Sequence, residues 1–451
     1  MGEFTLALSA LTGGGAGSLD ALDGADLVGG GAAVVVIDSG VYFYRLDASS
    51  GLAENSPYVI APDTNAGTKR WILKNPVDNF ERPKSITTDT TIYVATTGSD
   101  VTGDGTVSTP FATVQKALDS IKDCWIAGDV TVTIQIGDGQ YTMTEPITIT
   151  HPCGNNIAIT GENTYSKSMT SIQSSSGSAG AWSVILNVSD VTNIAVGDFA
   201  IVSAPSGGTL PYHIVGCHEV TNVDSGNSRI TVLTTHQDTT APSGAVAASV
   251  EIIKTVLQLA TGEHGIFVSG SNKLGSLANL VFDGLGSTGY GIYVTDFSFL
   301  RTPVSSFVGV FDCGLNVFSD NGSNIKAEGL LATSGANASH SIMADDHATI
   351  ICPNAIASGM QASSKYGFFS TYNSHIEATG SIAGGGLSIG FLASIQATFR
   401  LADAVANDCT TGFYCSRGSY MYALGATAIN CSTTFSPAVN TQGNEFGYID
   451  I

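Results

Sequence analysis

The chain has 451 residues, of which 12% are charged, and its 17 lysines and arginines against 38 aspartates and glutamates give a net charge of −21. A protein this acidic repels phosphates, which argues against binding of nucleic acid or of an anionic membrane surface. The sequence has no apolar run long enough for a membrane-spanning helix, and no basic segment precedes the short apolar run near residue 1. We therefore expect synthesis in a cytoplasm and no insertion into a membrane.

Residues 1–80 are predicted to form a small β-rich head domain. Two glycine-rich joints, at 13–17 and 29–33, precede the segment AVVVIDSGVYFYRLD. The β-branched and aromatic residues of this segment surround an Asp-Ser-Gly turn. A second pair of strands is predicted in PYVIAPDTNAGTKRWIL, on either side of a turn. The glycine runs lack the lysine and the strand-loop-helix context of a phosphate-binding loop, so we expect no nucleotide site there.

Residues 81–128 are predicted to be a connector that contains a short capping helix. Thr109 is a suitable N-cap, and Pro110 would then take the first helical position. Four apolar side chains would share one face of this helix: Phe111, Val114, Leu118 and Ile121. Such a helix would cover the open end of a solenoid, whose first strand would otherwise pair with other chains.

The first coils of that solenoid are predicted at 129–187 and a β-rich insertion at 188–257. The segments VTVTIQIGDGQY, EPITIT and NIAITG alternate as strands do, and the insertion alternates equally well, with hairpin turns between its strands. Four potential metal ligands lie in the insertion: His213, Cys217, His218 and His236. Their spacing matches no standard zinc pattern, so we predict no metal site.

Residues 258–437 repeat a unit of 22 to 26 residues, with starts at 265, 291, 316, 341, 367, 390, 412 and 434. Short apolar strands at this period predict a solenoid in which each coil buries its apolar face against the next. One column of the repeat runs from Ile266 to Phe435 and another from Leu274 to Met421, and both are predicted to point inward. Like residues stacked about 4.8 Å apart predict an all-β fold, the parallel β-helix. Residues 438–451 are predicted to be a C-terminal tail.

One outward column of the repeat is apolar or aromatic. Its members are Phe267, Tyr293, Phe318, Met343, Phe369, Leu392 and Tyr414. Such a stripe exceeds what a soluble monomer normally exposes, and burial of each large side chain is worth roughly 1.5 to 3 kcal/mol. We predict that the column forms the interface of a homo-oligomer, because this gain exceeds the usual costs of association. A platform on which sugars stack and a surface covered by the chain's own loops remain the alternatives.

The segment YVATTGSD…GDGT…TPFATVQKAL, followed by VTIQIGDGQY and by the repeat, resembles bacteriophage tailspike and tail-fibre proteins of the pectate-lyase-like β-helix superfamily. The head, with VYFYRLD and VIAPDTNAGTKRWIL, resembles N-terminal modules of phage tail proteins. The resemblance covers most of the chain. It implies a right-handed parallel β-helix, a homotrimer, and a place in the virion tail after synthesis in the bacterial host. The head would attach to the phage tail or baseplate, and the β-helix would face a host-surface glycan. No catalytic residue follows from it, since the family has no universal catalytic motif.

Turn residues of three successive units bring aspartates together: Asp296, Asp320, Asp345 and Asp346. Stacking would place their carboxylates roughly 5 to 10 Å apart, which is the range of the paired carboxylates in glycoside hydrolysis. Crowding would also raise the pKa of one of them, as a general acid requires. Three interpretations stay open. The aspartates cap tight turns, form a glycosidase centre, or hold a structural cation, for which calcium is expected.

A second outward column carries Arg301 and Lys326 on neighbouring coils, in a chain that has few cations. This pair would suit an anionic sugar or the uronate of a lyase substrate, although ordinary solvated charges explain it equally well. Tyr366 and Tyr372 are placed to stack on sugar rings, or simply to cover the edges of coils.

The sequence thus predicts a phage tailspike or tail fibre that recognises a host-surface polysaccharide as its receptor. Two alternatives remain. The same β-helix would be a polysaccharide depolymerase, a glycoside hydrolase rather than a lyase, or the chain would be a purely structural part of the virion. No further cofactor is expected.

Overall fold

The structure is a computed structural model that describes residues 4–13, 15–27, 31–37, 40–74, 84–178, 181–203, 214–234, 248–286, 288–303, 306–334, 340–359, 365–438 and 447–451. The chain divides into two compact units, Met1–Ser85 and Ile86–Ile451, and the short strand β6 (Lys84–Ile86) spans the division. Within the described residues, the structure contains no helix that is long and apolar enough to cross a membrane.

The first unit is built on one five-stranded sheet with the strand order β1-β2-β3-β5-β4. Its strands are β1 (Phe4–Leu8), β2 (Ala32–Ile37), β3 (Gly40–Asp47), β4 (Val59–Ile60) and β5 (Arg70–Leu73). The core of this unit contains Tyr44 and Trp71, which are 2% and 1% exposed. The hydroxyl of Tyr44 donates to the carbonyl oxygen of Pro57 at 2.7 Å, so the buried ring keeps a partner for its polar end.

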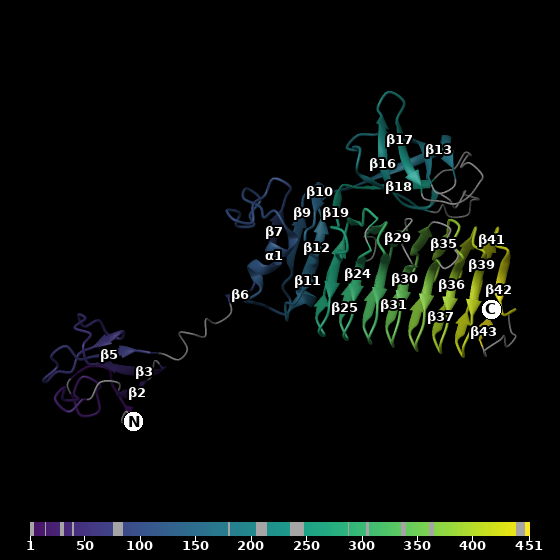
Figure 1. Ribbon diagram of the computed structural model, residues 1–451. Coiled ribbons are helices and arrows are strands. Elements are labelled where there is room, and N and C mark those ends of the chain that lie inside the picture. The colour runs from purple at the N-terminus through teal and green to yellow at the C-terminus, as the bar shows by residue number, and fades with distance from the viewer. Residues whose placement is uncertain are drawn as a thin grey trace. The chain divides into compact units, whose positions relative to one another are not determined.

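The second unit is a parallel β-helix, in which most coils contribute one strand to each of three sheets (Figure 1). The first sheet contains β10 (Gly139–Thr142), β19 (Thr255–Gln258), β23 (Leu280–Asp283), β26 (Val308–Phe311), β29 (Leu330–Ser334), β32 (Ile356–Gly359), β35 (Ile382–Gly384), β38 (Val405–Asn407) and β41 (Thr427–Ile429). The second sheet contains β11 (Ile147–Ile149), β20 (Ile266–Val268), β24 (Tyr290–Val294), β27 (Leu315–Ser319), β30 (His340–Ala344), β33 (Tyr366–Ser370), β36 (Ile389–Ala393), β39 (Thr411–Cys415) and β42 (Thr433–Ser436). The third sheet contains β21 (Lys273–Leu274), β25 (Phe299–Arg301), β28 (Asn324–Lys326), β31 (Thr349–Ile351), β34 (His375–Glu377), β37 (Thr398–Arg400), β40 (Tyr420–Tyr422) and β43 (Tyr448–Asp450).

The predicted columns are confirmed by the pairing register of the strands. Ile266 pairs with Ile292, and Ile292 pairs with Val317, and all three side chains are fully buried. Towards the C-terminal coils the same inward column becomes aromatic, and the ring of Phe391 lies between the rings of Phe368 and Phe413, with centroids 4.7 and 5.1 Å away. The interior is therefore a continuous stack in which each coil buries its apolar face on the next.

The N-terminal end of the β-helix is covered by helix α1 (Val114–Ile121), as predicted, but the helix begins later than expected (Figure 1). Thr113, and not Thr109, is the N-cap, and its hydroxyl accepts a hydrogen bond from the Lys116 backbone N–H at 3.2 Å. The preceding segment is held extended because the Asp100 carboxylate accepts hydrogen bonds from the backbone N–H groups of residues 112 and 113 and from the Thr113 hydroxyl. The buried face of the helix packs on the solenoid core.

Further strands complete the N-terminal end. A four-stranded sheet has the order β22-β12-β9-β7, with β7 (Thr90–Val94), β9 (Val132–Ile136), β12 (Ile157–Gly161) and β22 (Ser276–Ala278). The short strand β8 (Cys124–Ile126) and a single 3₁₀ turn, Gly154–Asn156, lie between them in the chain. Phe111, predicted on the helix, instead forms an isolated bridge with Val94.

The insertion is a closed antiparallel barrel with the strand order β13-β14-β17-β16-β15-β18. Its strands are β13 (Thr164–Ser178), β14 (Ala181–Val188), β15 (Phe199–Val202), β16 (Gly216–Asp224), β17 (Arg229–Thr234) and β18 (Ala248–Ile253). The predicted boundary at residue 188 was wrong, because strands β13 and β14 belong to the barrel and not to the first coils. The two strands pair with each other in an antiparallel hairpin, and β13 also pairs with the distant β18, but their alternation is the same as that of coil strands.

The barrel packs on the outer face of the first sheet. One buried cluster joins Phe199 and Cys217 of the barrel to Phe311 and Leu331 of the sheet, and the rings of Phe199 and Phe311 meet edge to face at 5.3 Å. His218 is fully buried, and its ring shares a hydrogen bond with the carbonyl oxygen of residue 214, whereas His213 and His236 lie outside the described residues. The predicted tail also differs, since β43 pairs with β40 and extends the third sheet.

A buried carboxyl at this interface gives a pH-dependent prediction. Asp283 closes β23 and is 5% exposed, and burial raises its pKa from 3.8 to about 6, with the charges of Glu219 and Asp312 adding to the rise. The folded protein therefore holds this proton more tightly than the unfolded chain does. The contribution of Asp283 to the free energy of unfolding is therefore largest below pH 4. This contribution falls by up to about 3 kcal/mol as the pH rises from 4 to 6.

We expect Asp283→Asn to be more stable than the wild type at pH 7 to 8 and to lose this part of the pH dependence. Urea unfolding at pH 5 and pH 8 measures the difference, with the exposed Asp129→Asn as the control. A variant with the wild-type loss of stability between the two pH values would contradict the assignment.

Candidate functional site

From the coil of residues 265–274 onward, each described coil turns from the second sheet to the third through two consecutive residues with positive φ angles, the corner turn. The pairs are Gly270 and Ser271, Asp296 and Phe297, Asn321 and Gly322, Asp346 and His347, Tyr372 and Asn373, Ile395 and Gln396, and Arg417 and Gly418. The residue before each of the last six pairs follows a second-sheet strand, and these six residues form the closing row: Thr295, Asp320, Asp345, Thr371, Ser394 and Ser416. The positive φ angles set the direction in which the side chains of the corner turn leave the backbone, and they separate these side chains from those of the closing row.

The structure separates the predicted aspartates into two kinds. Asp320 and Asp345 belong to the closing row and follow each other on adjacent coils, because the Asp320 N–H donates to Val294 and the Asp345 N–H donates to Ser319, at 3.0 and 2.9 Å. One coil step places the backbones of the two residues about 4.8 Å apart. Carboxyl groups carried on neighbouring coils can therefore approach the short separation of the paired carboxylates in retaining glycosidases.

The two carboxyl groups have different surroundings. Asp320 accepts hydrogen bonds from the Thr295 hydroxyl and, at 3.3 Å, from the Tyr293 hydroxyl, so both of its oxygens are engaged. Asp345 is half-buried, and this burial raises its pKa, with the charges of Asp320 and Asp346 raising it further. The pair therefore combines a hydrogen-bonded carboxylate with a carboxyl group that holds its proton more tightly.

Asp296 and Asp346 stand at the first position of the corner turn and are exposed. The Asn321 amide donates to Asp296 at 2.7 Å, and Asp346 forms a pair with the His347 ring at 2.9 Å. Asp and Asn tolerate the left-handed backbone better than other side chains, so the turn itself explains these two aspartates.

The predicted apolar column lies in register along the outer face of the second sheet. Six of its seven members are half-buried, and Leu392 is 6% exposed. The Tyr293 ring stacks on that of Phe318, with centroids 5.2 Å apart and planes 12° apart. Tyr366 lies on the same face, where it stacks on His340 at 4.8 Å. The hydrogen bond from Tyr293 to Asp320 joins this aromatic surface to the closing row.

A groove of about 430 Å³ continues this face towards the C-terminal coils. Its lining comes from the first residues of β33 and β36, from the column, from the closing row and from the corner turn: Tyr366, Ile389, Phe369, Leu392, Tyr414, Ser394, Ser416 and Arg417. The hydroxyl groups of Ser394 and Ser416 are 3.3 Å apart, so the row that carries the carboxylates continues as hydroxyls. An apolar floor with a few convergent polar groups is typical of a ligand site.

The other predicted binding residues lie elsewhere. Arg301 and Lys326 are paired in register on the third sheet and are exposed, so they face away from the second sheet that carries Asp320 and Asp345. Tyr372 lies at the corner turn and is 51% exposed. Within the described part of the chain, no three His, Cys, Asp or Glu side chains are grouped to hold a metal ion.

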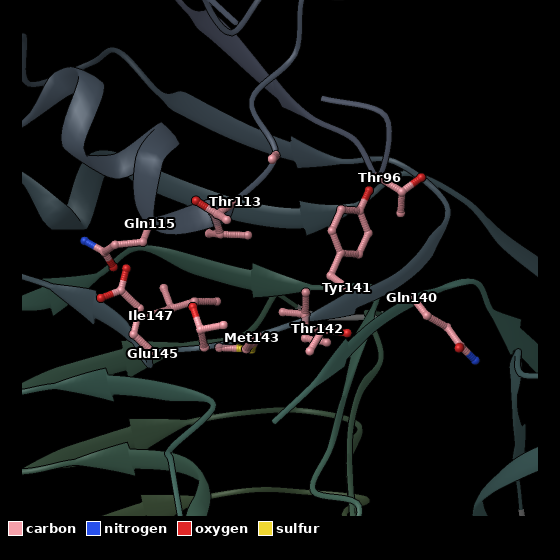
Figure 2. A pocket seen from close by; sticks show the side chains of 13 residues that line it. Thr96, Thr113, Gln115, Gln140, Tyr141, Thr142, Met143, Glu145 and Ile147 are labelled. Atoms are coloured by element: carbon pink, nitrogen blue, oxygen red, sulfur yellow. The ribbon is translucent and has the colours of Figure 1, made fainter. Parts of the chain in front are cut away.

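A second pocket, of about 200 Å³, lies between helix α1 and strand β10 (Figure 2). Figure 2 shows Gln115 and Glu145 at one end of the pocket and Thr96 beside Tyr141 at the other. Its polar groups are largely engaged within the protein: Gln115 accepts from Thr148 at 2.8 Å, and the Tyr141 hydroxyl donates to the residue 137 carbonyl at 2.9 Å.

Sequence reasoning did not identify Thr295, Ser394, Ser416 or Arg417 as parts of this face. The repeat contained a signal, since each of these residues occupies the fifth or sixth place of its unit, as the aspartates do. Their contribution depends on the corner geometry, which the spacing alone does not define.

No family model and no curated protein matches this chain. Solved structures similar to it include the tailspike protein gp49 of Acinetobacter baumannii bacteriophage Fri1, a capsular polysaccharide depolymerase, at 12% identity and a TM-score of 0.30, over 98% of this chain and 71% of that chain. The gp42 tailspike of Acinetobacter phage vb_AbaP_AS12 is 11% identical over 95% of this chain and 58% of that chain, with a TM-score of 0.31. The gp54 tailspike of A. baumannii bacteriophage AP22, in complex with A. baumannii capsular saccharide, is 9% identical over 70% and 64%, with a TM-score of 0.21. Likenesses this distant give no residue of this chain a role.

Proposed function

We propose that this chain is a bacteriophage tailspike that recognises a host-surface polysaccharide along the corner between its second and third sheets. The observation that carries the proposal is the arrangement of the closing row, in which two adjacent carboxyl groups and a run of hydroxyls border an aromatic face. Sugars present many hydrogen-bonding hydroxyls, which suit the carboxyl and hydroxyl groups of the closing row, while the aromatic face beside the row remains for the subunit interface proposed below. A rigid, periodic solenoid also suits a periodic polymer.

The test is binding of the purified protein to immobilised bacterial capsular and O-antigen polysaccharides. We expect saturable binding to a small subset of them. Binding to none would contradict the proposal, as would binding that survives removal of the half-buried closing-row side chains Asp320 and Asp345.

We further propose that the bound polysaccharide is hydrolysed. Asp345 would protonate the glycosidic oxygen as general acid while Asp320 attacks the sugar as nucleophile, since carboxyl groups on neighbouring coils suit the retaining geometry. A water deprotonated by Asp345 would then cleave the ester between the sugar and Asp320 and restore both carboxyl groups. The alternative, a lyase, would need cations beside the uronate, and Arg301 and Lys326 lie on another face. New reducing ends without unsaturated-uronate absorbance are the expected products. Absorbance would instead favour the lyase, and release of neither, from a glycan that is bound, would leave a receptor-binding protein.

We also propose that the chain is a homotrimer in the virion tail, attached to the tail or baseplate through its β-rich head. The apolar column supports the oligomer, because its half-buried aromatic rings would lose their remaining exposure against a neighbouring subunit. The closing row lies at the edge of the same face, so subunits that meet along the column can leave the corner open to the polysaccharide.

The double variant Phe318→Ser and Phe369→Ser tests the interface. We expect monomers or insoluble protein, because each ring contributes roughly 1.5 to 3 kcal/mol when buried. Sedimentation velocity measures the oligomeric state, and Phe297→Ser, outside the column, is the control that keeps it. A soluble oligomer of unchanged melting temperature would show that the column is not the interface.

A further inference from the structure

We infer that Phe297 and Tyr372 are sugar-stacking platforms at the two ends of the polysaccharide site, so that the polymer lies along the corner, parallel to the solenoid axis. This inference rests on the proposed function. The inference assigns the binding of two sugar rings to Phe297 and Tyr372, whose aromatic side chains the fold does not require at these positions of the corner turn.

The backbone at both residues is unfavourable for an aromatic side chain. Phe297 has φ 59° and Tyr372 has φ 47°, in the left-handed region that bulky residues rarely adopt. Asn321 and Gly322 make the same turn with residues that tolerate it, whereas Ile395 also takes a positive φ, of 54°, but is half-buried. It is the combination of strained backbone with an exposed aromatic ring that distinguishes Phe297 and Tyr372, because neither packing nor the turn selects such a side chain.

Both rings are presented to solvent, and the Phe297 ring also has a packing contact that holds it. Phe297 is 70% exposed and Tyr372 is 51% exposed. The Phe297 ring lies over Gly322 on the next coil, where a β-carbon would come within 2.7 Å of the ring. Because residue 322 is a glycine, one edge of the Phe297 ring packs against its backbone, and the remaining surface of the ring is free to contact a ligand.

The two platforms bracket the carboxyl pair. The closing row runs from Thr295, beside Phe297, through Asp320 and Asp345 to Thr371, beside Tyr372. These are three coil steps, or about 14 Å along the axis. A polymer that stacks on both rings must therefore pass Asp320 and Asp345 between them, which is the position that cleavage requires.

The test replaces each platform by the residue that the corner turn tolerates, Phe297→Asn and Tyr372→Asn. Leu285→Asn is the matched control, because Leu285 is also apolar, 62% exposed and at φ 50°, but it follows β23 at the other end of the coil. Affinity for a polysaccharide from the capsular and O-antigen panel and the melting temperature are measured for all three. We expect each platform variant to bind about tenfold more weakly, which corresponds to about 1.4 kcal/mol, with an unchanged or higher melting temperature. The control should keep its affinity.

Affinity within twofold of wild type for both platform variants would overturn the inference while leaving the proposed function intact. A clear fall in their melting temperature would overturn it as well, because the rings would then serve the fold. If the wild type binds no polysaccharide of the panel, the proposed function fails, and this inference fails with it.

Discussion

Asp345→Asn is expected to lower the rate of polysaccharide release by about a hundredfold or more, while the polysaccharide still binds. The amide cannot donate the proton that the leaving oxygen needs, and general acid catalysis typically contributes 10²- to 10⁴-fold. Asp320→Asn should cause a loss of similar size, because the amide is a poor nucleophile. Release of new reducing ends from a bound polysaccharide, measured under single-turnover conditions, gives the rates.

The pH dependence of the wild type follows from the raised pKa of Asp345. A general acid acts only when protonated, and the protonated fraction falls as the pH rises through its pKa. We therefore expect the rate to decline on the alkaline side at a higher pH than an ordinary aspartate would give. Burial opposes the charged form of this residue, so the Asn variant should be at least as stable as the wild type.

Asp346→Asn is the matched control for both substitutions. Asp346 adjoins Asp345 in sequence, but it is exposed at the first position of the corner turn, where Asn is equally well tolerated. Its rate should stay within about threefold of the wild type. If Asp346→Asn abolished release and Asp345→Asn did not, the assignment of the pair would be wrong.

The distinction between Asp345 and Asp346 shows where prediction from the sequence ends. The repeat predicted that aspartates of successive coils gather, because stacking transfers a place in the unit to a place in space. One residue along the chain decides whether a carboxyl belongs to the closing row or to the turn. That depends on where the strand stops and the positive φ angles begin, and the sequence alone does not locate this point.

The inward columns could be predicted because every coil repeats the same alternation, so eight units reinforce a single register. The helix start could not, because Asp100 holds the segment before Thr113 through hydrogen bonds across a loop. The barrel boundary failed for another reason. Strand β13 pairs with its neighbour β14 in a hairpin and with the distant β18, and a barrel strand alternates in the same way as a coil strand, so the sequence did not separate the two.

Phe391→Ala is expected to lower the free energy of unfolding by about 3 to 5 kcal/mol. Phe391 is fully buried between the rings of Phe368 and Phe413, and the ring of Phe399 meets it at 90° with centroids 6.3 Å apart. The cavity cannot collapse easily, because the strand pairs on either side keep the neighbouring rings at the coil spacing. Urea unfolding measures the loss. Phe391→Leu is the control, which should cost less, and a loss below about 1 kcal/mol for the alanine variant would contradict this account.

The same substitution also tests whether the site coils depend on the C-terminal coils. In a solenoid each coil contacts only its neighbours, so stability is approximately a sum of nearest-neighbour interfaces. Phe391→Ala weakens the interfaces with the coils of Phe368 and Phe413. The coil of Asp345 lies two coil steps from Phe391, and the coil of Asp320 lies three. Hydrogen exchange should therefore show lost protection across β33, β36 and β39 first, while the amides of β24 and β27 stay protected. Equal loss in both regions would mean that the β-helix unfolds as one cooperative unit, and that the carboxyl pair depends on the whole stack.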